Sequence, residues 1–86
     1  MSTFKAKILT PEGSIFEGEV SGVQMPGTQG SFEVKTNHAP IVSTLQDGTV
    51  TVRSTDGEQV FHITGGMVEA AANELTLLAE SGEAQA

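Results

Sequence analysis

The segment that decides the fold is Asp47–Gly57, which has the sequence DGTVTVRSTDG. It begins and ends with an Asp-Gly pair, a dipeptide that tolerates the positive φ angles of a tight turn. Between the two pairs, Val50 and Val52 alternate with polar residues, which is the pattern of a strand with one buried and one exposed face. The segment therefore predicts a short hairpin arm with a turn at each of its ends.

The same arrangement of short alternating runs and turns extends in both directions. Phe4, Ala6 and Ile8 alternate with lysines near the amino terminus, and Phe32 and Val34 alternate with charged residues further along. Glycine or proline interrupts these runs about every ten residues, a spacing typical of a β-sandwich or barrel. We therefore predict an all-β fold.

The length of the chain limits its core. With 86 residues it forms one small domain, which buries roughly 60 to 65% of the surface that the unfolded chain exposes. The sequence has no cysteine, so no disulfide reinforces this core. A permanent protein partner would add stability, because it binds only the folded state.

The charge of the chain excludes several kinds of partner. Eleven acidic and four basic residues give a net charge of -7, which repels phosphate backbones and anionic membrane surfaces. No apolar run approaches the roughly 20 residues of a membrane span, and the first residues do not resemble a signal peptide. We expect no nucleic-acid partner, no direct membrane insertion and a cytoplasmic location.

The last third of the chain allows two interpretations. Apolar positions between Val68 and Ala79 fit one face of a helix. The alternative is a β-hairpin with arms at 67–72 and 75–79 that turns at Asn73-Glu74. The β pattern of the preceding residues favours the hairpin slightly.

The final residues, 81–86, are polar and lack apolar periodicity. We expect them to form a frayed tail after a single domain that covers residues 1–80. No linker or internal repeat divides that domain.

Few residues of the sequence could carry chemistry. His38 and His62 stand apart from any thiol or cluster of carboxylates, whereas a zinc site needs three or four converging ligands. No nucleophile elbow or complete phosphate-binding motif is present. We expect no catalytic residue, no metal and no cofactor. An alternative function is a small acidic carrier domain of the lipoyl or biotinyl type, modified at Lys35.

A set of motifs in a fixed order resembles a known family. The segment Pro26–Pro40 contains Pro-Gly, a further glycine, an apolar alternation and then His-Ala-Pro. Ile8–Gly13 precedes it, and Gly65–Glu69 and Asn73–Glu80 follow it. Together these segments, which cover nearly the whole chain, resemble the epsilon subunit of F-type ATP synthases, called delta in mitochondria.

The resemblance is to the amino-terminal domain of the family, and it implies a flattened β-sandwich of about ten short strands in two sheets. We expect no carboxy-terminal helical domain, which is a departure from many members of the family. The resemblance also decides the last third of the chain in favour of two strands. The implied function is that of a noncatalytic subunit of the central stalk. Such a subunit links gamma to the c-ring and works with the alpha and beta subunits of the catalytic head. It couples proton-driven rotation to ATP synthesis. Its implied location is the cytoplasmic face of a bacterial inner membrane, where it is bound peripherally.

The resemblance also assigns contact residues. The family loop that meets the c-ring matches Thr28, Gln29, Gly30 and Ser31, and the region near gamma matches His38, Ala39, Pro40, Ser43 and Thr44. Many members carry an acidic residue at the position of Ser31. Because serine is uncharged, we expect this chain to make neutral hydrogen bonds to the ring instead of an ionic contact. We expect Gly27 and Gly30 to adopt backbone angles that valine would block.

Many members of the family continue into a carboxy-terminal helical hairpin that inhibits ATP hydrolysis and in some species binds ATP. No such segment follows Glu80 in this sequence. We therefore expect neither inhibition by that route nor nucleotide binding.

Overall fold

The computed structural model describes residues 2–85, and the regular elements in this range are ten β-strands. Met1, the first residue of the predicted domain 1–80, and Ala86, the last of the predicted tail 81–86, lie outside the described residues. The strands are β1 (Phe4–Thr10), β2 (Gly13–Val20), β3 (Gly22–Gly27), β4 (Gly30–Lys35), β5 (Ile41–Leu45), β6 (Gly48–Ser54), β7 (Gly57–Ile63), β8 (Gly66–Ala71), β9 (Glu74–Ala79) and β10 (Gly82–Gln85). In the described range no helix has the length and apolar character that crossing a membrane requires.

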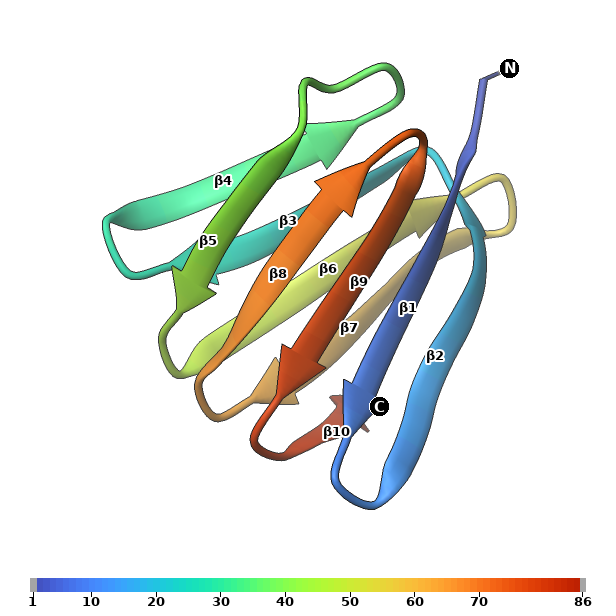
Figure 1. Ribbon diagram of the computed structural model, residues 1–86. Coiled ribbons are helices and arrows are strands. Elements are labelled where there is room, and N and C mark those ends of the chain that lie inside the picture. Colours follow the sequence, from blue (N-terminus) through green and yellow to red (C-terminus); the bar gives the residue numbers. More distant parts are fainter. Residues whose placement is uncertain (1, 86) are drawn as a thin grey trace.

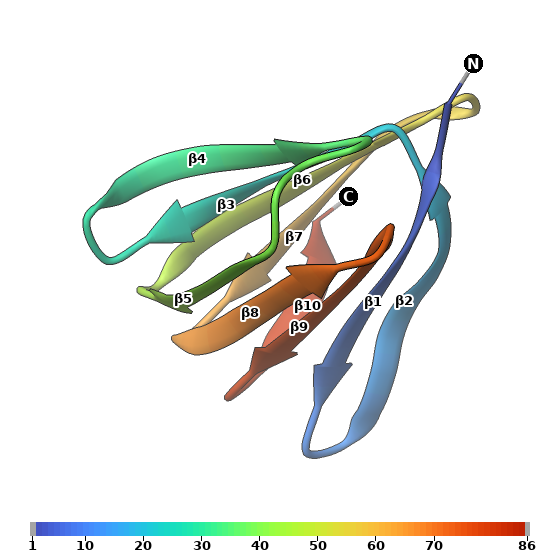
Figure 2. The ribbon, with the colours of Figure 1, turned by 45° about the horizontal axis from the view of Figure 1, so that its top comes forward.

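The strands form two layers that face each other (Figure 1). One layer contains β5, β8, β9, β1 and β2, and the other contains β4, β3, β6, β7 and β10; Figure 2 shows the separation of the two layers. Among the described strands only β1 and β9 run parallel, and the other pairs are antiparallel. β2 contacts β6 and β10, which brings the far edges of the layers together. The predicted all-β sandwich of two sheets is confirmed.

Strand β3 lies in the layer with β4 and β6 but is also hydrogen-bonded to the other layer. On one side it pairs with β4 along its whole length. On the other side its first part, Gly22–Gln24, pairs with β6, and Gly27 pairs with Leu45 at the end of β5. The amide of Gln46 donates to the carbonyl of Pro26 at 2.8 Å and tightens this second junction. The β3–β4 hairpin is therefore anchored in both layers.

The interior is filled by the apolar side chains that alternate along the strands. The largest fully buried side chains are Phe61, Ile8, Met25, Ile63, Leu75 and Leu77, with Val20, Val23, Val34, Val50, Val52 and Val68. Phe16 on β2 meets Phe61 edge to face, with 5.9 Å between ring centroids, and so joins the two layers. No polar or charged side chain is buried among the described residues. The core is stabilised by apolar burial without the cost of desolvating polar side chains.

The Asp47–Gly57 segment behaves differently at its two ends. The second turn forms the predicted hairpin, because Ser54 pairs with Gly57, whose φ is +119°. The first turn is not a hairpin, since β5 and β6 do not pair and lie in different layers. Gly48 is needed there for space, because a Cβ atom at this position would lie 2.9 Å from the Cβ of Pro26. The first Asp-Gly pair thus carries the chain from one layer to the other.

The last third of the chain is the predicted β-hairpin, formed by β8 and β9. Its turn lies one residue earlier than predicted, at Ala72-Asn73, because Ala71 pairs with Glu74. Both turn residues have left-handed angles, with φ of 52° at Ala72 and 60° at Asn73. Alanine rarely adopts this conformation, which is why the sequence directed the prediction to the Asn-Glu pair instead.

The predicted frayed tail is wrong for the described part of 81–86. Gly82–Gln85 form β10, which pairs with β7 from Gly82–Ile63 to Gln85–Val60. The free edge of β7 supplies backbone partners, so the tail needs no apolar periodicity to order. Gly82 also lies close to Ile15, because a Cβ atom there would be 3.1 Å from the Ile15 Cδ1. The sandwich therefore extends to Gln85, five residues beyond the predicted limit of residue 80.

Ala72→Gly should stabilise the fold. A left-handed angle costs alanine roughly 1–2 kcal/mol, and glycine avoids this cost while losing about 0.5–1 kcal/mol through the greater freedom of the unfolded chain. We expect the free energy of unfolding to rise by about 0.5–1 kcal/mol, measured by urea denaturation and circular dichroism. Ala71→Gly is the matched control, because Ala71 is also exposed but has ordinary strand angles, and it should destabilise. Equal destabilisation by the two substitutions would contradict the strain assigned to Ala72.

Candidate functional site

The four residues assigned to the c-ring contact lie together at one tip of the sandwich. Thr28 and Gln29 form the turn between β3 and β4, and Gly30 and Ser31 begin β4. All four are exposed, and Gly30 has a φ of +129°. In Figure 1 this turn projects beyond the neighbouring strand β6. The sequence therefore located a protruding, polar turn.

The five residues assigned to the gamma contact do not form one cluster. His38, Ala39 and Pro40 lie in the loop between β4 and β5, at the end of the sandwich opposite the β3–β4 turn (Figure 1). Ser43 and Thr44 lie on β5, which runs from that loop toward the β3–β4 turn. The set therefore follows the length of β5 from one end of the molecule to the other.

The two assigned sets meet where β5 ends. The amide of Thr28 donates to the carbonyl of Thr44 at 3.1 Å, and the hydroxyl oxygens of the two threonines are 2.8 Å apart. An open depression of about 470 Å³ lies beside this contact and is lined by Thr28, Gln29 and residues 41–44. We call the contact the Thr28–Thr44 junction. It joins the proposed ring turn directly to the proposed gamma strand.

Glycines shape the β3–β4 hairpin for two different reasons. Gly30 needs its positive φ, as predicted. Gly27 has no such angle, so the predicted reason is wrong for this residue. A Cβ atom at Gly27 would instead lie 2.6 Å from the Gly30 carbonyl oxygen and 2.8 Å from the ring of Phe32. The missing side chain lets the Phe32 ring cover the hairpin.

His38 is held by its own loop. Its amide donates to the carbonyl of Lys35 at 3.2 Å, and its Nδ1 lies 2.6 Å from the carbonyl oxygen of Ala39. The nearby cavity, shared with Asn73 and Glu74, has a volume of about 10 Å³, enough for one water molecule at most. The loop thus presents His38 as a surface group rather than as part of a ligand pocket.

Two exposed apolar side chains, Met67 and Leu78, lie in a row with Thr44 of the junction, and these two were not predicted from the sequence. Strand register places Thr44 beside Met67 and Met67 beside Leu78, so the three residues cross β5, β8 and β9 on one outer face. Met67 is 42% and Leu78 48% exposed. We call Thr44, Met67 and Leu78 the outer row. The row lines an open depression of about 440 Å³ that also includes Pro11.

One signal in the sequence could have located this row. Leu77 and Leu78 are consecutive apolar residues in a strand, so one of them has to point outward. The register of β8 against β9, which the sequence does not specify, brings Met67 beside it. Single exposed apolar residues are ordinary, whereas neighbours across adjacent strands form a continuous apolar patch.

Groups that could carry chemistry do not converge in the described range. His62 lies on β7, opposite Thr49 on one side and Glu83 on the other. Within residues 2–85 no three His, Asp or Glu side chains are placed to hold a metal ion. Lys35 ends strand β4, whereas a carrier lysine stands at the tip of a hairpin. Nothing in the geometry supports the carrier alternative.

Comparison with known sequences gives consistent matches. Residues 3–85 match the family model of the ATP synthase delta/epsilon chain, beta-sandwich domain. The ATP synthase epsilon chain of Caulobacter vibrioides is 42% identical over 80 residues, which cover 93% of each chain. Epsilon chain 2 of Nitrobacter hamburgensis is 41% identical over 81 residues, which cover 94% of this chain and 60% of that relative. The chain thus spans nearly the full length of the first relative and less than two thirds of the second.

Comparison with solved structures shows the same fold. A chain in the structure of the Euglena gracilis mitochondrial ATP synthase, containing OSCP, F1 and c-ring, matches with a TM-score of 0.90 and 15% identity. The match covers 98% of this chain and 54% of that one. A chain in the central stalk and c-ring structure of the Tetrahymena thermophila enzyme matches with a TM-score of 0.77 and 18% identity, over 92% of this chain and 64% of that one.

Gly27→Ala should destabilise the protein by roughly 1–3 kcal/mol, because the new Cβ atom forces the hairpin or the Phe32 ring to move. Gly18→Ala is the control, since the nearest atom to a Cβ there, the Cζ of Phe16, lies at 3.6 Å, an ordinary contact distance. It should change the free energy of unfolding by less than about 1 kcal/mol. Both values come from chemical denaturation. If Gly27→Ala proves as mild as Gly18→Ala, the close packing at Gly27 is refuted.

Proposed function

This chain belongs to the ATP synthase delta/epsilon family, in the β-sandwich domain of that family, and from this premise we propose that it is a subunit of the ATP synthase central stalk. In this proposal it links the gamma subunit to the c-ring, so that proton-driven rotation reaches the catalytic head formed with alpha and beta. The observation that carries the proposal is the Thr28–Thr44 junction, where the residues matched to the two partners touch.

The proposed c-ring contact is the turn Thr28-Gln29 together with Gly30 and Ser31. These exposed residues present hydroxyl, amide and backbone groups and no charged side chain. They therefore suit hydrogen bonding to polar loops of the ring. Anchoring of the hairpin in both layers keeps the turn in a fixed position, which a contact that transmits force requires.

The proposed gamma contact runs along β5, from His38–Pro40 to Ser43 and Thr44, and continues onto the outer row. The row supplies apolar area next to polar residues, the composition of a protein interface. Val42, 64% exposed, extends the apolar area along β5. Gamma would then cover side chains that are otherwise exposed to water, which stabilises a domain with a thin core.

We infer that the chain itself is noncatalytic, because its proposed task needs two surfaces and a stiff body rather than a reactive group. Its place would be peripheral, on the cytoplasmic face of a bacterial inner membrane, which agrees with the bacterial origin of the epsilon-chain relatives. We also predicted that the chain does not inhibit ATP hydrolysis through a helical hairpin. The β-sandwich domain does not test this point, so it stays a prediction.

A direct experiment is purification of the tagged chain from detergent-solubilised native membranes, followed by mass spectrometry of the eluate. We expect gamma and subunit c, together with alpha and beta, at stoichiometric levels. An eluate that lacks gamma would refute the proposed function. The intact mass of the purified chain would also reveal any lipoyl or biotinyl adduct on Lys35, and we expect none.

Met67→Glu should weaken binding to a catalytic head that contains gamma but was prepared without this chain. A carboxylate in the middle of the outer row would lose its water on binding, so we expect affinity to fall by at least about tenfold. Thr49→Glu is the control, because Thr49 is exposed on β6 in the other layer, and it should bind like the wild-type chain. Titration with labelled chain gives both affinities. Unchanged affinity for Met67→Glu would exclude the outer row from the gamma contact.

A further inference from the structure

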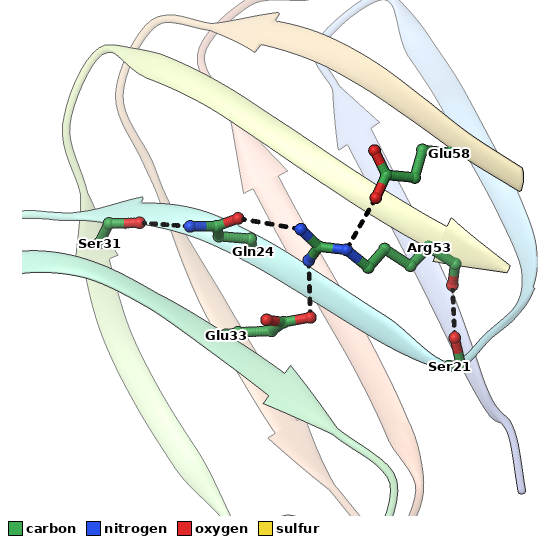
Figure 3. A network of polar contacts seen from close by, with 6 residues as sticks. All are labelled: Ser21, Gln24, Ser31, Glu33, Arg53 and Glu58. Atoms are coloured by element: carbon green, nitrogen blue, oxygen red, sulfur yellow. Dashed lines mark hydrogen bonds and ion pairs between the residues drawn. The ribbon is translucent and has the colours of Figure 1, made fainter.

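Arg53, the only arginine of the chain, lies at the centre of a polar network on the outer face of the layer that contains β4, β3, β6 and β7 (Figure 3). Its Nη1 is 2.7 Å from the Oε2 of Glu33, and its Nε is 2.9 Å from the Oε2 of Glu58. Its Nη2 lies 3.5 Å from the Oε1 of Gln24. One guanidinium thus contacts acceptors on three other strands.

The register of the strands builds this site. Arg53 stands opposite Gly22 on one side and opposite Glu58 on the other. Gly22 leaves the space through which the Glu33 carboxylate reaches the guanidinium, because a Cβ atom at Gly22 would lie 2.7 Å from the Glu33 Oε2. The backbone of Arg53 is fixed as well, since its carbonyl accepts from the amide of Ser21 at 2.7 Å.

The network determines orientation more than it adds stability. The Glu33 carboxylate, followed by the hydrogen bond to Glu58, raises the pKa of Arg53 above its ordinary value, so the side chain stays cationic. The side chains of Arg53 and Glu58 are 36% and 57% exposed, and ion pairs with this exposure contribute little to the free energy of folding. The guanidinium nevertheless orients its partners: it holds the two carboxylates at 2.7 and 2.9 Å and, by a longer contact of 3.5 Å, the amide of Gln24.

Gln24 relays this orientation to the β3–β4 hairpin. Its Oε1 faces the guanidinium, which directs its Nε2 toward the Oγ of Ser31 at 3.3 Å (Figure 3). The Ser31 hydroxyl therefore accepts from Gln24, and its own proton is free to be donated elsewhere. Within residues 2–85 the structure records no acceptor for that proton.

We propose that Arg53 is a positioning residue for the ring contact: through Gln24 it sets the Ser31 hydroxyl as a hydrogen-bond donor toward a carbonyl oxygen in a polar loop of the c-ring. This proposal rests on the proposed function and deepens it. The positive charge of Arg53 contacts no ring atom in this scheme and acts only through the amide of Gln24.

The test uses the complex of this chain with gamma, binding to purified c-rings in lipid nanodiscs. Arg53→Met keeps an unbranched apolar side chain in place of the arginine stem and removes the guanidinium. We expect ring affinity to fall about threefold to tenfold, the effect of one hydrogen bond. Affinity for gamma should be unchanged, because Arg53 lies on the layer opposite the outer row. Lys35→Met is the matched control, since it also removes one positive charge from this region, and it should bind the ring normally.

A second variant separates positioning from general damage. Gln24→Met removes the relay but leaves both ion pairs of Arg53, and it should lower ring affinity as much as Arg53→Met. The double variant should be no weaker than either single variant, because both changes break one chain of contacts. In the free wild-type chain, nuclear magnetic resonance should show one set of Gln24 side-chain NH2 signals, with chemical shifts different from those of a solvent-exposed glutamine. Arg53→Met should return these chemical shifts to the solvent-exposed values.

The outcomes distinguish a failure of the positioning role of Arg53 from a failure of the proposed function. Wild-type ring affinity in Arg53→Met, or additive losses in the double variant, would overturn the positioning role and leave the proposed function standing. Failure of the wild-type complex to bind c-rings would overturn both. Loss of gamma binding by Arg53→Met, with Lys35→Met intact, would show that Arg53 maintains the fold instead and would refute the positioning role.

Discussion

One strand, β3, is hydrogen-bonded to both layers of the sandwich, and the rest of the structure depends on this shared strand. Its first part pairs with β6 and its last residue with β5, while β4 pairs along its other edge. The β3–β4 hairpin can close tightly because Gly27 has no side chain where the Gly30 carbonyl and the Phe32 ring approach. The shared strand fixes how the layers face each other, and it places the β3–β4 turn beside the end of β5.

This constraint explains how a small domain can serve two partners. Thr28 in the turn and Thr44 on β5 are neighbours, so a force applied to the turn reaches β5 through hydrogen bonds rather than through a flexible connection. The outer row then continues from Thr44 across β8 and β9. On the other layer, Arg53 and Gln24 hold the opposite side of the same hairpin. The hairpin is thus supported from both faces of the sandwich.

The sequence predicts the fold well because its alternating pattern records burial directly. Val50 and Val52 are buried as their alternation indicates, and the Asp56-Gly57 turn forms its hairpin. The prediction of a hairpin at Asp47-Gly48 is wrong, because the dipeptide indicates a change of direction but does not specify that the strands on its two sides pair with each other. β10 was missed since backbone pairing with an open edge leaves no mark on a polar sequence.

The site was predictable only in part, because its geometry depends on long-range register. The motif Pro26–Pro40 indicates which turn and loop are functional, but nothing in it shows that Thr28 touches Thr44 or that the β4–β5 loop, which contains His38, lies at the other end of the molecule. The adjacency of Met67 and Leu78 and the reach of Arg53 to Glu33 follow from strand order, which local sequence does not encode. What the sequence cannot specify is therefore the set of contacts between strands distant along the chain.

The most direct measurement of the central claim is a cryo-electron microscopy structure of the complex purified through a tag on this chain. We expect Thr28 and Gln29 to lie against the polar loops of the c-ring and the face with β5, β8 and β9 to lie against gamma. A complex in which the β6–β7 face meets gamma, or in which the β3–β4 turn points away from the ring into solvent, would contradict it.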